Sequence, residues 1–171
     1  MIRYLTIEEE RFEDAPFVGA LISAISCPIG CKKCFNQKLK DLPIQQDHAW
    51  NIIERVRQNP FHEGIILGGL EWSAQPDELY HLVTLALSAK LKVMIYTGYT
   101  LEEFLHKIPK LRYLSGELYL KYGSFRSHIP GYQSRFGVHL ASGNQKILHY
   151  RSIASTEQHP SFIPYAARLY E

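Results

Sequence analysis

Short apolar runs alternate with amphipathic stretches along most of the chain. The runs at 17–25, 64–67 and 93–96 are rich in small or β-branched residues and end at glycine, threonine or cysteine, which is typical of buried strands. Between them, apolar residues recur at helical spacing. This spacing predicts one helix after Asp47, the expected N-cap, and another that starts at Pro76.

The pattern continues with a short helix and two further extended segments. Thr100 followed by Glu103 is the signature of a capping box, and it predicts a short helix at about 101–106. Residues 112–120 are predicted to form a fourth strand, and residues 145–151 read as an extended segment.

The alternation of strands and helices predicts a fold class. Repeated βαβ units form a mostly parallel sheet, and right-handed crossovers would place the helices on one face of a curling sheet. A complete eight-fold barrel takes about 250 residues, whereas this chain has 171. The prediction is therefore an α/β fold with a partial, open barrel. One domain is expected over 1–171, with its core at about 17–120 and a more irregular C-terminal extension at about 121–171.

Composition and charge narrow the class of protein. A hydrophobic share of 46% and a charged share of 21% are those of an ordinary globular protein, and a net charge of +2 gives no argument for a nucleic-acid partner. No apolar run reaches about 18 residues, so no transmembrane helix is expected. The first ten residues lack the pattern of a signal peptide. We therefore expect a cytoplasmic protein whose thiols stay reduced.

The three cysteines of the chain lie within eight residues, directly after the first predicted strand. Cys27, Cys31 and Cys34 have the spacing C-x3-C-x2-C. One interpretation is a 4Fe-4S cluster held by three thiolates, which leaves one iron open. Alternatives are a zinc site completed by a distant ligand such as His48, a redox pair of the last two cysteines, or three structural cysteines. Inert cysteines have no reason to cluster in a polar loop, which disfavours the last alternative.

This cysteine loop resembles that of the radical S-adenosylmethionine superfamily. The resemblance implies that Cys27, Cys31 and Cys34 ligate the cluster and form the catalytic centre. It also implies that the open iron binds the amino and carboxylate groups of S-adenosyl-L-methionine, whose reductive cleavage yields a 5′-deoxyadenosyl radical. The chain has Lys33 where the family often has an aromatic residue, and Phe35 follows the last cysteine.

Two strand ends that contain glycine resemble cofactor-binding motifs of the same superfamily. The second predicted strand ends in Gly-Gly-Leu-Glu, similar to a Gly-Gly-acid motif with the acid one residue late, and the third ends in Thr-Gly. Taken alone, both are also ordinary strand-to-loop turns. The resemblance assigns to S-adenosylmethionine binding the residues Gly68, Gly69, Glu71, Thr97 and Gly98.

A combination of features resembles one branch, the activating protein of the anaerobic ribonucleoside-triphosphate reductase. These features are the short length, Cys-Phe-Asn at 34–36, Thr-Gly-Tyr at 97–99, and a segment at 141–147 similar to Ser-x-Asn-Gln-Arg-Ile. Asn144 in the last segment is assigned to cofactor binding, although Gly-Asn also forms tight turns. The chain departs from the branch at 13–16, where Glu-Asp-Ala-Pro replaces a glycine-rich stretch.

The resemblance implies an enzyme, a radical-SAM oxidoreductase that generates a glycyl radical on the large subunit of the reductase. A flavodoxin- or ferredoxin-type protein would supply electrons, and neither nucleic acid nor a membrane is an expected partner. Two other classes stay open: a small-molecule radical enzyme similar to the 7-carboxy-7-deazaguanine synthases, and a non-enzymatic iron–sulfur or zinc-binding module. Trp72 is predicted to pack either near the adenine or in the core.

Overall fold

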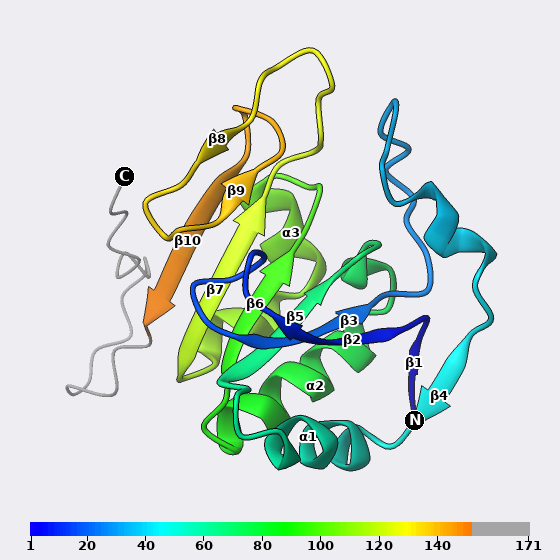
Figure 1. Cartoon of the computed structure of the whole chain (residues 1–171), viewed down its shortest axis with the longest axis vertical. Helices are drawn as coiled ribbons and strands as arrows, with labels where there is room; N and C mark the ends of the chain where they lie inside the picture. The colour runs from blue at the N-terminus through cyan, green and yellow to red at the C-terminus, as the bar shows by residue number, and fades with distance from the viewer. Residues whose placement is uncertain (152–171) are drawn as a thin grey trace.

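The computed structural model describes residues 1–151, and a six-stranded sheet forms its centre (Figure 1). Residues 152–171 of the predicted C-terminal extension lie outside the described residues. In sheet order the strands are β10 (Lys146–Arg151), β7 (Glu117–Tyr122), β6 (Lys92–Tyr96), β5 (Gly64–Gly68), β3 (Gly19–Ser23) and β2 (Ile7–Arg11). The four inner strands run parallel, and both edge strands are antiparallel to their neighbours. The mixed α/β fold with a mostly parallel sheet follows the predicted alternation of strands and helices.

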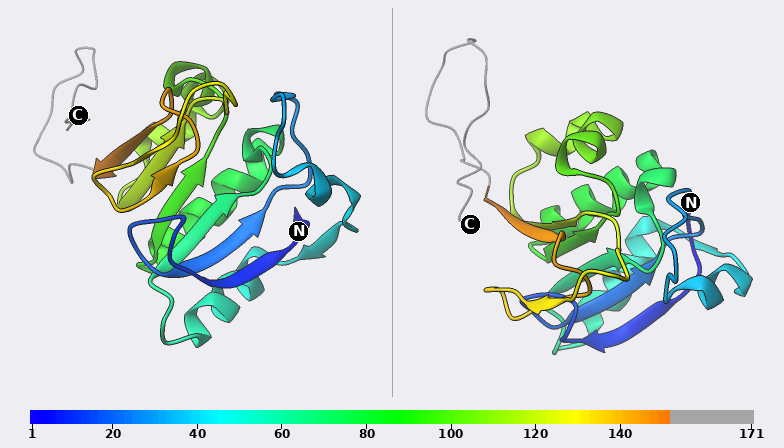
Figure 2. Two further views of the ribbon diagram at one scale, coloured as in Figure 1. Left: turned by 45° about the horizontal axis from the view of Figure 1, so that its top comes forward. Right: turned by 90° about the horizontal axis from the view of Figure 1, so that it is seen from above.

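Three helices pack on one face of this sheet: α1 (Ala49–Gln58), α2 (Pro76–Ser88) and α3 (Leu101–Lys107) (Figure 2). Their buried apolar side chains join those of the inner strands in the main hydrophobic core. Within the part of the chain that the structure describes, no helix combines the length and the apolar character needed to cross a bilayer.

The predicted helix signals are confirmed for α2 and α3. Pro76 stands in the first turn of α2, where its missing N–H needs no partner. At the start of α3, the Thr100 hydroxyl accepts a hydrogen bond from the Glu103 amide at 3.3 Å, and the Glu103 carboxylate accepts one from the Thr100 amide at 2.9 Å. This reciprocal pair is the predicted capping box.

The N-cap of α1 is His48, so the prediction of Asp47 was wrong by one residue. The Asp47 carboxylate instead accepts hydrogen bonds from the His48 amide and the Asn51 side chain, both at 2.7 Å. Asp47 belongs to the short strand β4 (Gln45–Asp47), which pairs with β1 (Ile2–Tyr4). This pairing holds Asp47 in extended backbone and moves the start of the helix.

The fourth inner strand also begins later than the predicted 112–120. Residues Pro109–Tyr113 form a short 3-10 helix, η3, and β7 follows only after Gly116, whose φ is +141°. Proline favours the first turn of such a helix, which explains the difference. Five strands were not predicted: β1, β2, β4 and the two strands of a hairpin, β8 (Tyr132–Gln133) and β9 (His139–Leu140).

The two faces of the sheet have different surroundings, because successive side chains of a strand point to opposite faces. One face packs against the helices. The other carries a smaller apolar cluster that includes Phe17, Ile66, Met94 and Tyr119. Beyond this cluster, towards the C-terminal ends of the parallel strands, the second face borders a pocket.

Gly64 at the start of β5 allows the backbones of β5 and β6 to approach each other closely. A Cβ atom on Gly64 would lie 2.1 Å from the carbonyl oxygen of Lys92 in β6. We expect Gly64→Ala to lower the free energy of unfolding by about 3 kcal/mol, because the backbone of two paired strands must move. Urea denaturation followed by circular dichroism measures this loss. The matched control is Gly68→Ala, whose Cβ would meet a Leu21 methyl group at 3.2 Å and should cost less; equal losses would contradict the explanation.

Candidate metal centre

A pocket of about 400 Å³ lies at the C-terminal ends of the inner strands. Its floor includes Leu21 and Ser23 of β3, Tyr96 of β6 and Lys121 of β7, together with Gly69 just beyond β5. Ligands of open α/β sheets bind at this edge, because the connecting loops leave a crevice there. The volume is within the range of small-molecule and cofactor sites.

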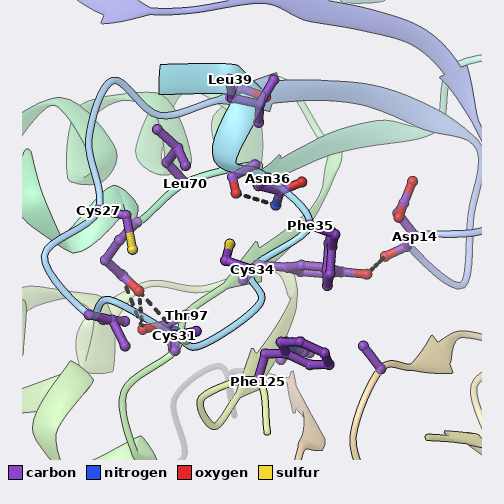
Figure 3. Close-up of a pocket in the computed structure, with 18 of the residues that line it drawn as sticks. Asp14, Cys27, Cys31, Cys34, Phe35, Asn36, Leu39, Leu70, Thr97 and Phe125 are labelled. Atoms are coloured by element: carbon purple, nitrogen blue, oxygen red, sulfur yellow. Dashed lines mark hydrogen bonds between the residues drawn. The ribbon is translucent and has the colours of Figure 1, made fainter. Parts of the chain in front are cut away.

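The three cysteines all line this pocket from the loop that follows β3 (Figure 3). Each is a partly buried free thiol. The loop turns back on itself through Gly30 and Lys33, both with φ near +60°, and through a hydrogen bond from the Cys34 amide to the Cys31 carbonyl oxygen at 3.3 Å. The sequence spacing is thereby converted into three thiols that border one cavity.

The environment of Cys27 favours the neutral thiol when no metal is bound. Burial raises the pKa of Cys27, while the backbone N–H groups of Ile29 and Gly30 oppose this shift and the Glu71 carboxylate adds to it. A raised pKa makes a thiol a poor nucleophile. A metal ion stabilises the thiolate directly, so this environment is compatible with Cys27 as a metal ligand.

A zinc site of the predicted kind has no support in this part of the chain. His48, the proposed distant ligand, is exposed and does not line the pocket. Within residues 1–151, no three His, Cys, Asp or Glu side chains converge on the position of a single ion. An iron–sulfur cluster has no such requirement, because each thiolate binds a different iron. The three thiols and the size of the pocket therefore fit a cluster better than one ion.

Glu71 follows β5, is buried in the pocket wall, and is hydrogen-bonded to the end of β6. Its carboxylate accepts from the Thr97 hydroxyl at 3.0 and 3.1 Å, from the Gly98 amide at 2.9 Å, and from the Ser73 amide at 3.1 Å. These bonds occupy most of the acceptor positions of a carboxylate. The geometry favours a bracing role for Glu71 over the cofactor contact that the resemblance implies.

The glycine of this motif that borders the pocket is Gly69. Its φ is +71°, and a Cβ atom there would lie 2.3 Å from the hydroxyl oxygen of Ser23. The Ser23 hydroxyl is buried and has no hydrogen-bond partner in the described chain. Gly68 does not line the pocket; its carbonyl oxygen accepts a hydrogen bond from the Ala24 amide. The missing side chain of Gly69 thus leaves space beside the Ser23 hydroxyl, and a bound group can form a hydrogen bond with that hydroxyl.

The Asn-Gln segment brings Gln145, and not Asn144, to the pocket. The Asn144 side chain donates to the carbonyl oxygen of Ser124 at 2.9 Å. Gln145 donates to the carbonyl oxygen of Gly123 at 3.2 Å and accepts from the Ser142 amide. These bonds tie the segment to the loop after β7.

Trp72 packs in the core, which decides between its two predicted positions. The side chain is fully buried, and its indole N–H donates to the carbonyl oxygen of Ile22 at 3.0 Å. It does not line the pocket. The adenine contact is therefore not available to Trp72 in this structure.

Several pocket residues were missed by the sequence reasoning, and Lys121 is the most notable. It lies on β7 with its ammonium nitrogen 5.2 Å from the centre of the Tyr96 ring. Burial lowers the pKa of Lys121 to about 8, an effect that Cys31 and Glu71 oppose. One feature of the sequence could have identified Lys121 as a pocket residue. It is a lysine near the end of an apolar strand, and the ends of parallel strands lie at the same sheet edge as the cysteine loop.

A model of the 4Fe-4S single cluster domain family matches residues 19–128, which is more than half of the chain. The matched region runs from β3 through β7 and includes all three cysteines. No match was found among curated proteins or among solved structures.

The three cysteines should each be required for iron binding. After anaerobic reconstitution, we expect about four irons per wild-type chain, and a loss of most of this iron in Cys27→Ala, Cys31→Ala and Cys34→Ala. Iron and acid-labile sulfide analysis with visible absorbance measures the effect. His48→Ala is the control and should keep the full iron content. Bound zinc that depends on His48 would contradict this assignment.

Glu71 should contribute to stability through the bonds that it accepts. We expect Glu71→Gln to lower the free energy of unfolding by about 1–3 kcal/mol, because an amide N–H₂ then faces donors that need an acceptor. Chemical denaturation of the cluster-free protein isolates this effect. Glu103→Gln is a matched control on an exposed helix cap, and it should cost less. A stability loss at Glu71 no greater than at Glu103 would refute the bracing role.

Proposed function

The chain belongs to the 4Fe-4S single cluster domain family, and we propose that it holds its cluster through Cys27, Cys31 and Cys34 and cleaves S-adenosylmethionine reductively. The observation that carries this proposal is that three thiols line one pocket in a chain with three cysteines. A 4Fe-4S cluster normally takes four cysteine ligands. Three protein ligands leave one iron for a small molecule.

When bound and reduced, the cluster would supply the electron that breaks a carbon–sulfur bond of S-adenosylmethionine and yields a radical able to remove a hydrogen atom. The residues of the chain then have the tasks of binding, orienting and excluding water. Gly69 and Gly98 lack side chains that would block the approach of a ligand to the backbone. A Cβ atom on Gly98 would lie 2.5 Å from a methyl group of Ile29 in the cysteine loop. Gly98 therefore also lets this loop pack closely against the end of β6.

Two aromatic residues flank the pocket on its solvent side. The rings of Phe35 and Phe125 meet edge to face, with 5.5 Å between their centres, and both line the pocket (Figure 3). Phe35 is 68% exposed. We assign this pair to contact with the molecule that supplies the hydrogen atom.

We propose a protein target, the large subunit of an anaerobic ribonucleoside-triphosphate reductase, on which a glycyl radical would form. The supporting observations are the branch-like segments at 97–99 and 141–147, both of which contribute residues to the pocket. The sheet also supports it, because within residues 1–151 the edge strands β2 and β10 do not pair with each other. An open sheet of this kind leaves room at its edges for a loop of another protein.

We further propose an acidic electron donor of the flavodoxin or ferredoxin type. Its support is a set of exposed lysines on the cysteine loop and the short 3-10 helix η1 (Gln37–Asp41) that follows. Opposite charge on a partner would steer its approach to the cluster side of the protein. The lysines are Lys32, Lys33, Lys38 and Lys40.

The central test is whether the reconstituted, reduced protein converts S-adenosylmethionine to 5′-deoxyadenosine. We expect wild type to form the product and Cys31→Ala to form none, because the loss of one ligand removes the cluster. Chromatography of the quenched reaction measures the product. A protein with a full cluster that yields none, even with an anaerobic reductase present, would overturn the proposal in favour of a non-enzymatic iron–sulfur module.

The target is tested separately by electron paramagnetic resonance. We expect a glycyl-radical signal on the reductase subunit that requires both S-adenosylmethionine and the wild-type cysteines. Formation of 5′-deoxyadenosine without this signal would reject the protein target and favour a small-molecule substrate.

A further inference from the structure

Lys121 places a partly buried positive charge in the pocket, and within residues 1–151 no carboxylate forms an ion pair with it. The arginine that also lines the pocket is balanced differently. Arg11 pairs with Glu8 at 2.9 Å and with Asp14 at 2.6 Å. An ammonium removed from water without a counter-charge is costly. A bound negative group would therefore stabilise the Lys121 ammonium, since residues 1–151 do not provide an ion-pair partner for it.

The position of this ammonium is set by rigid parts of the sheet. Lys121 lies opposite Tyr96 in the register of β6 and β7, and its carbonyl oxygen accepts a hydrogen bond from the Thr97 amide at 2.8 Å. The Tyr96 ring lies beneath the ammonium, and the Tyr96 hydroxyl donates to the carbonyl oxygen of Asp14 at 2.7 Å. The aromatic ring attracts the cation and limits its movement.

The carboxylate that acts on this ammonium is that of Glu71, and Cys31 lines the same pocket. The Glu71 carboxylate already receives hydrogen bonds from Thr97, Gly98 and Ser73. Burial lowers the pKa of Lys121 to about 8, which keeps most of the side chain protonated at neutral pH. Inside protein, a unit charge acts far more strongly on a neighbour than it does in water.

We propose that Lys121 is a positioning residue for charge, which raises the reduction potential of the cluster bound through Cys31 and its two neighbouring cysteines. The inference rests on the cluster ligation in the proposed function, and not on the cleavage of S-adenosylmethionine. On reduction, one electron passes from an external one-electron donor to the cluster, which becomes more negative by one charge. A nearby ammonium stabilises the reduced form more than the oxidised form, and charge near a cluster is one determinant of its potential.

The test is a potentiometric titration of the anaerobically reconstituted full chain, without S-adenosylmethionine, followed by the paramagnetic signal of the reduced cluster. Dithionite serves as the electron donor. In Lys121→Met, the ratio of reduced to oxidised cluster at a fixed potential should fall at least tenfold, equivalent to about 59 mV for one electron. Lys121→Arg keeps the charge and should stay close to wild type.

The matched control is Lys107→Met. Lys107 also holds its ammonium over an aromatic ring, 4.5 Å from the centre of Tyr99, but it does not line the pocket. We expect no change in potential from this variant. If Lys121→Met fails to retain a cluster, Lys121→Gln provides a second neutral side chain that is still polar.

Three outcomes overturn the inference. The first is an unchanged potential in a neutral variant with a full cluster, which would make Lys121 a ligand-contacting or structural residue. The second is a potential in Lys121→Arg as low as in Lys121→Met, which would exclude charge as the cause. The third is an equal change in the Lys107 control. A lowered potential in a protein that never cleaves S-adenosylmethionine would support the role of Lys121 and reject the proposed reaction, so the two failures are distinguishable.

Discussion

The buried carboxylate of Glu71 joins the ends of two neighbouring parallel strands, and the shape of the pocket depends on this contact. Through it, the loop after β5 and the Thr97–Gly98 turn after β6 are held in one arrangement. The cysteine loop packs against the same place, because Ile29 fills the space that a side chain at residue 98 would need. A displacement of the Glu71 carboxylate would therefore move the turns that contain Gly69 and Gly98. It would also change the surface on which the cysteine loop packs.

The positively charged side chains around the Glu71 carboxylate are distributed in a way that suits the proposed electron transfer. Arg11 is neutralised by its own pair of carboxylates at one end of the pocket. Lys121 lines the same pocket as the cysteines and has no such pair among residues 1–151, and the lysines of the cysteine loop are exposed to solvent. A pocket bounded by a fixed internal cation stabilises added negative charge, while the exposed lysines can attract an acidic partner. The interior charge and the surface charge thus serve different steps of one proposed reaction.

Much of the fold was predictable because its signals are local. The apolar runs of the inner strands and the Pro76 and Thr100 helix starts depend on neighbouring residues, and they are confirmed. The edge strand β2 was missed because its sequence, Ile-Glu-Glu-Glu-Arg, is that of an exposed segment. Charged residues are usual on such edges, where they discourage pairing with other chains. Short strands such as β1 and β4 exist through pairing with distant segments, which no local pattern reports.

The sequence by itself determined the candidate ligand set, because the spacing of the cysteines within one loop already limits what they can bind together. It also located the glycine-containing turns that border the pocket. The tertiary structure alone decided which side chains face the pocket: Lys121 and Gln145 do, whereas Trp72 and Asn144 do not. The physical reason is that a side chain's direction depends on the strand face and on packing across the sheet. Both are set by contacts between residues far apart in the chain.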